Sequence, residues 1–139
     1  MRAPLAVVVV VALALAAAAL AVFGLGDAST LVPPPEAEAE SFVRAMATHR
    51  YEQALAHATD EVRAAGAGAL RRRQQEIERA RGRVRDARGG PAWRSGDWAE
   101  AAVRLTTDAG EAALRFRLVR RAGQWRVASL GEWEVTPVR

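Results

Sequence analysis

Hydrophobic and polar positions divide this chain into an apolar N-terminal segment and a charged remainder. Leu5 to Leu25 holds 21 residues without a charged or polar side chain. A helix that rises ~1.5 Å per residue needs roughly 20 residues to cross the hydrocarbon core of a bilayer. All 16 acidic residues and 19 of the 20 basic ones follow Gly26. The pattern predicts a membrane anchor over residues 1–26, a Pro-rich linker over 27–35 and a domain over 36–139.

The first half of this domain has apolar positions at helical spacing. Residues 36–49 place them three and four apart and carry acidic side chains in the first turn, where the helix dipole favours negative charge. Residues 51–58 predict a short second helix. Thr59 or Asp60 can cap a third helix that runs to about Arg81 and contains two glycines. The apolar stripe of the third helix is narrow and consists of Val62, Ala69, Leu70, Ile77 and Ala80.

After Gly82 the period changes from helical to alternating. Residues 98–107, 111–121 and 124–130 alternate apolar and polar side chains and are joined by short Gly-containing loops, which indicates antiparallel hairpins. Residues 83–88 and 132–138 are weaker strand candidates. The order indicates an α+β fold: an N-terminal transmembrane helix, then two or three helices packed on a curved antiparallel sheet. The predicted core of the sheet is Leu105, Leu114, Phe116, Leu118, Trp125 and Val127.

The apolar segment has two interpretations, an uncleaved anchor or a cleaved signal peptide. The apolar region of a signal peptide is typically about 7–15 residues, so the length favours the anchor. Gly24-Leu25-Gly26 and Gly26-Asp27-Ala28 are imperfect cleavage sites, and a secreted product is the alternative. Arg2 precedes the segment, so the positive-inside rule places the N-terminus in the cytoplasm and the domain outside. The expected location is the cell membrane, with a single pass and a stiff spacer at Pro33 to Pro35.

The composition and motifs of the chain exclude several kinds of functional site. There is no Cys, which excludes disulfides, thiolate metal sites and the lipid-modified Cys of a lipoprotein. The net charge of +4 is below that of a dedicated nucleic-acid binder, so no nucleic acid is expected as a partner. The sequence has no nucleophile elbow, Walker loop or dinucleotide fingerprint, and no cofactor is expected.

Two motifs of the predicted hairpins resemble those of a known family. They are Gly96-Asp97-Trp98-Ala99, which opens a strand, and Gly123-Gln124-Trp125-Arg126-Val127, which follows a charged turn. Over about residues 36–135 the pattern resembles the nuclear-transport-factor-like superfamily, the cone-shaped α+β fold shared with SnoaL-type cyclases and ketosteroid isomerase. Within it the chain looks most like small envelope domains carried behind a lipobox or a transmembrane segment. The motifs are structural, so the resemblance carries over no catalytic residue.

Few residues are candidates for chemistry. His49 and His57 are eight apart and match no metal-ligand spacing, so no metal site is expected. Tyr51 and Asp60 could line the mouth of the cone, as the phenol and carboxylate that ketosteroid-isomerase-like acid/base chemistry needs. That pairing rests on analogy of fold alone.

Arginine is concentrated between Arg63 and Arg88, which holds nine Arg against three acidic residues. This run could contact anionic lipid or an acidic partner surface. The alternative is a solvated helix face, which is favoured because Arg is abundant throughout the chain. The candidate contact residues are Arg71, Arg72, Arg73, Arg79 and Arg81.

Two classes of function follow. The first is a non-catalytic, membrane-tethered binding or assembly module for a protein partner of the cell envelope or for a small ligand. The alternative is a small-molecule enzyme, similar to an isomerase, cyclase or hydrolase, that uses the cone pocket. An inward-facing Asp beside Tyr would favour catalysis, whereas a pocket lined by apolar side chains alone would favour binding.

The first testable consequence concerns topology. Because Leu5 to Leu25 follows Arg2 and precedes Asp27, the full chain should stay in the membrane fraction with its C-terminus outside. Protease added to intact protoplasts is expected to remove a C-terminal tag. A protected tag would reverse the topology, and a secreted species that begins near Asp27 would identify the segment as a signal peptide.

Overall fold

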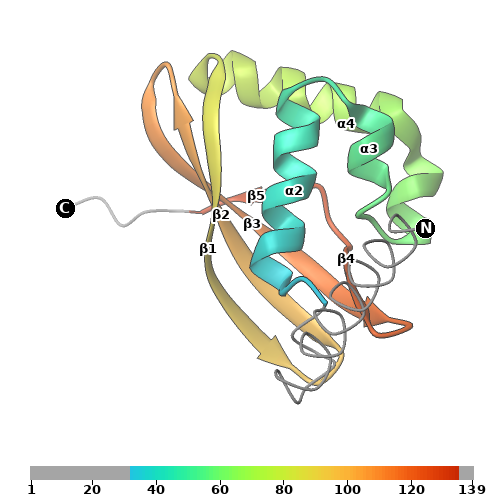
Figure 1. The fold of residues 1–139 in the computed structure, drawn as a ribbon. Coiled ribbons are helices and arrows are strands. Elements are labelled where there is room, and N and C mark those ends of the chain that lie inside the picture. The colour runs from blue at the N-terminus through green and yellow to red at the C-terminus, as the bar shows by residue number, and fades with distance from the viewer. Residues whose placement is uncertain (1–31, 135–139) are drawn as a thin grey trace, which may run out of the picture. The chain divides into compact units, whose positions relative to one another are not determined.

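The computed structural model describes residues 32–134, which form three helices on one face of an antiparallel sheet (Figure 1). This confirms the α+β class. The predicted anchor lies outside the described residues, and within 32–134 no helix is long and apolar enough to cross a membrane. The helices are α2 (Pro35–Ala47), α3 (Tyr51–Leu55) and α4 (Asp60–Arg81), and the strands are β1 (Val84–Ser95), β2 (Trp98–Thr107), β3 (Gly110–Arg121), β4 (Gln124–Val127) and β5 (Glu132–Trp133).

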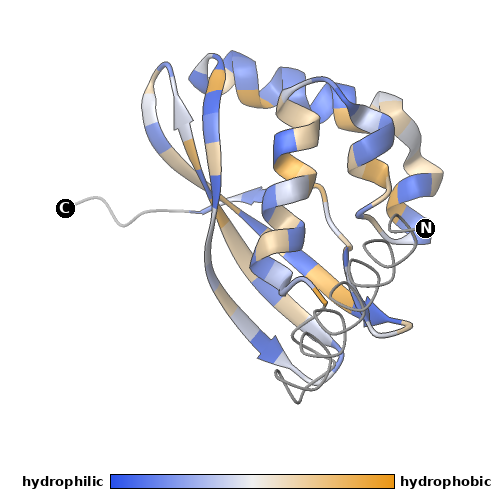
Figure 2. Cartoon of the chain, in the orientation of Figure 1, coloured by the Kyte–Doolittle hydropathy of each residue, from blue (hydrophilic) through white to orange (hydrophobic). Residues whose placement is uncertain are grey.

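The sheet has the order β1-β2-β3-β4, and β5 pairs with β3. Two-residue turns join the first four strands. In the last of these turns both Ala122 and Gly123 have positive φ, 52° and 75°, as the type I′ hairpin requires. The predicted alternation of β2 and β3 is confirmed, because hydrophobic residues alternate with hydrophilic ones along the strands (Figure 2).

Strand β1 is longer than the predicted 83–88. It continues through Gly89, Gly90 and Pro91, with a register shift between Gly89 and Ala92. Proline is tolerated here because β1 is an edge strand and the bulge removes the need for a ladder hydrogen bond. Gly89 lets the strand approach α2, since a Cβ at this position would lie 2.7 Å from the carbonyl oxygen of Glu36.

Strand β4 is shorter than the predicted 124–130 and stops at Val127. The chain then leaves the edge of β3 for a few residues and pairs with the same strand again as β5, beside Leu114 and Arg115. Gly131 allows this irregular connection, because it has a φ of 88° and a Cβ there would lie 2.8 Å from the Phe116 ring. Of the predicted last strand, residues 135–138 lie outside the described part.

The helices differ from the prediction mainly at their ends. Both α2 and α3 finish two to three residues early, and Ala80 of the expected apolar stripe is exposed. The Thr59 hydroxyl caps α4 by accepting from the backbone N–H of Val62 at 3.4 Å. Gly66, with a φ of 81°, breaks α4 into two helical segments.

An ion pair joins the start of α4 to the sheet. The Arg121 guanidinium donates to both carboxylate oxygens of Glu61, at 2.9 and 3.2 Å, and lowers the pKa of Glu61 from 4.5 to about 2. A depressed pKa stabilises the fold above pH 4.5, and this contribution is lost as the pH falls toward 2. The pair is exposed, so its contribution is small.

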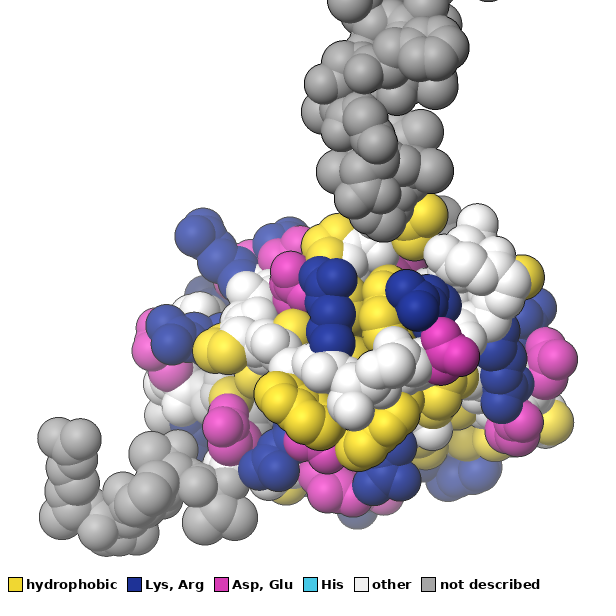
Figure 3. Space-filling model, turned by 90° about the horizontal axis from the view of Figure 1, so that it is seen from below, with side chains coloured by type: hydrophobic (Ala, Val, Ile, Leu, Met, Phe, Trp, Pro, Cys, Tyr) yellow, Lys and Arg dark blue, Asp and Glu magenta, His cyan; other side chains and the backbone are white. Residues whose placement is uncertain are grey.

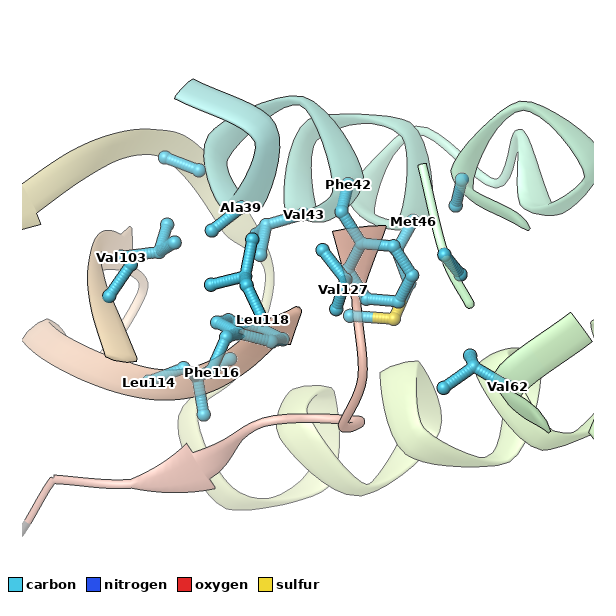
Figure 4. Packing of buried hydrophobic residues seen from close by; sticks show 14 of the residues in the cluster. Ala39, Phe42, Val43, Met46, Val62, Val103, Leu114, Phe116, Leu118 and Val127 are labelled. Atoms are coloured by element: carbon cyan, nitrogen blue, oxygen red, sulfur yellow. The ribbon is translucent and has the colours of Figure 1, made fainter. Parts of the chain in front are cut away.

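Side chains fill the space between α2 and the sheet. Phe42 and Met46 of α2 are fully buried against Phe116 and Leu118 of β3 (Figure 4). The rings of Phe42 and Phe116 meet edge to face, 5.7 Å between centroids. The predicted core residues are all buried in this cluster: Leu105, Leu114, Phe116, Leu118, Trp125 and Val127.

Replacing the central aromatic residue tests this core. Phe116→Ala should lower the free energy of unfolding by about 3–5 kcal/mol, because the side chain is fully buried. Denaturant titration of the full chain in detergent measures the change. The matched control is Arg104→Ala on the outer face of β2, an exposed site, where a change within about 0.5 kcal/mol is expected. A loss below about 1 kcal/mol for Phe116→Ala would contradict the strand register.

Candidate functional site

A pocket of about 380 Å³ lies between the α2–α3 turn and α4. Two residues singled out from the sequence, Tyr51 and Arg71, line it together although they are 20 positions apart. The full lining is His49, Tyr51, Arg71, Gln74, Gln75 and Glu78. All six side chains carry polar atoms, so a ligand in this pocket would find hydrogen-bond partners.

The shape of the turn places His49 in this pocket. After α2 ends at Ala47, His49 has a φ of 61° and donates its N–H to the carbonyl of Met46 at 3.1 Å. Glycine usually occupies this left-handed position after a helix, and another residue there costs about 1 kcal/mol or more. The strained turn brings Nδ1 of His49 to 2.8 Å from the Tyr51 hydroxyl. The two rings meet edge to face, which fixes the phenol at the pocket wall.

Arg71 supplies a positive charge beside this phenol. Its guanidinium carbon lies 5.6 Å from the centroid of the Tyr51 ring, a cation–π contact. Within residues 32–134, no carboxylate forms an ion pair with Arg71, and its side chain is exposed. The guanidinium therefore keeps its donors available for a carboxylate or another anionic group.

Gln74 lines the same pocket and has an unpaired acceptor. The residue is 1% exposed. Its Nε2 donates to Oε1 of Glu78 at 3.1 Å, but its own Oε1 is buried and has no hydrogen-bond partner. A buried acceptor without a donor costs about 1–3 kcal/mol. A ligand N–H that reached this oxygen would recover that free energy.

Sequence reasoning missed Gln74, although the sequence contained a signal. The residue falls four positions after Leu70 and three before Ile77, both of which are buried. It therefore stands on the apolar stripe of the third predicted helix. A polar side chain on such a stripe has to find partners inside the protein, which makes the position a candidate for function.

Asp60 lies apart from this pocket. It is the first residue of α4, its side chain is 86% exposed, and it pairs with Arg63 at 3.3 Å. Asp60 is not among the residues that line the pocket with Tyr51. The phenol–carboxylate pair considered from the fold analogy is thus not assembled there.

The candidate basic residues of α4 point in different directions, because successive helix positions are about 100° apart. Arg73 has only 15% of its side chain exposed and donates to the carbonyls of Leu130 and Gly131, so it holds the connection between β4 and β5. Arg81 donates to the carbonyl of Glu111 at 2.9 Å and holds the β2–β3 turn region. The complete set, Arg71, Arg72, Arg73, Arg79 and Arg81, is therefore not one continuous contact face.

A second polar cluster joins α2 to the α3–α4 connection. Oε2 of Glu38 lies 2.8 Å from Nδ1 of His57, and the Glu38 side chain is only 9% exposed. A carboxylate that orients a histidine in this way is a frequent element of acid/base sites. In the part of the chain that the structure describes, no three His, Asp or Glu side chains are placed to hold a metal ion. From the sequence, Glu38 is only one of the acidic residues in the first turn of its helix.

Comparison with known proteins supports the fold. No protein-family model matches the chain, and no curated protein matches it in sequence. Among solved structures it is similar to an NTF2-like transpeptidase from Campylobacter jejuni, with a TM-score of 0.54 and 15% identity over 70% of this chain and 99% of the other. It is also similar to a SEC-C motif containing protein from Rhodopseudomonas palustris, with a TM-score of 0.53 and 17% identity over 70% of this chain and 77% of the other. The chain has a nuclear-transport-factor-like fold.

Proposed function

We propose that this protein is a non-catalytic binding or assembly module, tethered to the cell membrane by one N-terminal helix with its domain outside the cytoplasm. Its place would be among the membrane-anchored envelope proteins of the nuclear-transport-factor-like type. The partner is an envelope protein or a small polar ligand, and the pocket at His49, Tyr51, Arg71 and Gln74 is the binding site. Anionic lipid is a further partner of the tethered domain.

The observation that carries this proposal is the buried Gln74 oxygen without a donor, beside the available charge of Arg71. Together they are complementary to a ligand that carries an N–H group and a negative charge. A peptide segment with a carboxylate has both groups. The phenol of Tyr51 and the imidazole of His49, already bonded to each other, add a rigid wall against which such a segment can pack.

The enzymatic alternative is favoured by one observation, the pairing of Glu38 with His57. A histidine held by a buried carboxylate can act as a general base toward a bound substrate. His57 lines a separate pocket of about 470 Å³ with Ser41 and Arg44. The two functions therefore depend on different residues, and substitutions can separate them.

Stability provides one test of the binding site. Gln74→Leu should raise the free energy of unfolding by about 1 kcal/mol, because it removes a buried acceptor that has no donor and leaves the partly exposed Glu78 to water. Thermal unfolding of the unliganded full chain measures the change. Gln75→Leu, at the exposed neighbouring position, should leave the stability unchanged. A loss of stability in Gln74→Leu would mean that the oxygen is satisfied in the free protein.

Cross-linking in native membranes tests the partner. A photoreactive residue at position 75, on the pocket wall, should capture a partner of defined mass from the full chain. Arg71→Gln should lower the yield about tenfold, because a charge-assisted hydrogen bond contributes about 1.5 kcal/mol. The matched control is Arg72→Gln, which changes the next residue, outside the pocket lining.

The result can go against the proposal in two ways. Equal cross-linking yields in Arg71→Gln and Arg72→Gln would show that the pocket does not bind the partner. Turnover of a small molecule that is lost in His57→Asn and kept in Arg71→Gln would establish the enzymatic alternative at the Glu38–His57 pair.

A further inference from the structure

Two tryptophans are exposed side by side on the outer face of the sheet. Trp93 of β1 is 56% exposed and Trp98 of β2 is 42% exposed, and they are the exposed large hydrophobic side chains of the described residues. Their rings meet edge to face, 5.4 Å between centroids. Because Trp93 is paired in register with Glu100, and Glu100 alternates with the buried Ala99 and Ala101, both rings point away from the helices.

The chain enters the domain at the same end of the sheet. Helix α2 runs antiparallel to β1, since Arg44 lies 3.3 Å from Asp86 whereas Glu36 lies against Gly89. The first residues of α2 therefore lie toward the end of β1 that carries Trp93, as Figure 1 shows. Viewed along this end, hydrophobic side chains gather beside arginines (Figure 3).

Basic side chains of the outer face lie beside the tryptophan pair. Arg115 and Arg117 of β3 are exposed, alternate with buried residues of this strand, and form no ion pair within residues 32–134. Arg115 lines a hollow together with Trp93. Glu100 is paired in register with Arg117 on the same face. A shallow hollow of about 610 Å³ runs past Trp98 and Arg117. Tryptophan with arginine is the combination found at the headgroup level of membranes, where an aromatic ring meets apolar chains and a guanidinium meets phosphate.

Leu25 and Pro34, the residue before α2, are nine positions apart. Fully extended, this stretch reaches about 30 Å at most, and Pro33 and Pro34 stiffen the end that meets α2. A domain of about 100 residues has a radius of gyration of ~13 Å, so it is about as wide as the spacer is long. The end that carries the spacer must then stay near the membrane.

From these observations we infer that the outer end of the β1–β2 hairpin, with Trp93 and Trp98, docks on the surface of the membrane that anchors the chain. This inference rests on the proposed tether. The two rings enter the headgroup region, and Arg115 and Arg117 contact lipid phosphates. Docking fixes the orientation of the domain, because it adds a second attachment beside the spacer.

Fluorescence of the full chain in vesicles tests the docking. Vesicles contain phosphatidylcholine and phosphatidylglycerol, part of it carrying bromine near the top of the acyl chains, which quenches tryptophan at short range. Brominated lipid should quench the wild type, and the quenching should be lost in the double variant Trp93→Phe with Trp98→Phe. The matched control is Trp133→Phe, a partly buried residue of β5 on another part of the sheet, which should keep the quenching. Arg115→Gln with Arg117→Gln should reduce the quenching in these vesicles more than in phosphatidylcholine alone.

Each other result overturns the inference in a distinct way. If the chain fails to float with the vesicles, the proposed tether fails and the docking fails with it. If the chain floats but bromine does not quench it, or quenches the double variant equally, the docking alone fails. If the emission of the two tryptophans shifts with the protein-to-lipid ratio but is not quenched by bromine, the surface binds a second copy of the chain instead of the membrane.

Discussion

The edge-to-face contact of Phe42 with Phe116 fixes the distance between the helix layer and the sheet, and much of the molecule depends on it. With both rings fully buried and Met46 beside them, α2 packs closely on the inner face of the sheet. Polar chemistry is consequently found at the ends of the helices, where the turn after α2 meets α4.

Arginine is the only basic residue of the chain apart from histidine. Some arginines stabilise the fold, whereas Arg71 is available for binding. The planar group of arginine can donate to two acceptors at once, so Arg73 holds two carbonyls of the connection between β4 and β5, and Arg121 holds both oxygens of Glu61. Such residues stabilise the fold and are poor candidates for binding a partner. Arg71 differs because within residues 32–134 it forms no ion pair, and its contact with the Tyr51 ring leaves its hydrogen-bond donors available.

The sequence predicted the parts of the fold in which a local pattern and the tertiary packing agree. Strand β2 has the predicted bounds, and Thr59 caps α4, because alternation and capping act within a few residues. Strand β1 extends past its prediction because Gly89 to Pro91 has the composition of a turn, and only the contact with Glu36 and the bulge make it a strand. The pocket was predicted only as isolated residues. Its assembly depends on the left-handed turn at His49 and on a buried amide 25 positions later, at Gln74, neither of which a periodicity reveals.

The arrangement along α2 relates the pocket to the proposed tether. The proposed spacer leads to the first residue of this 13-residue helix, and the pocket begins just beyond its last. A helix of this length spans about 20 Å. When the first end faces the membrane, the pocket lies at least that far from the spacer, on the side of the domain that faces away from the lipid. Docking through Trp93 and Trp98 would hold this orientation, since a single stiff spacer limits distance but not rotation. A partner in the envelope would then meet Tyr51 and Arg71 in a constant direction, which reduces the orientational cost of each encounter.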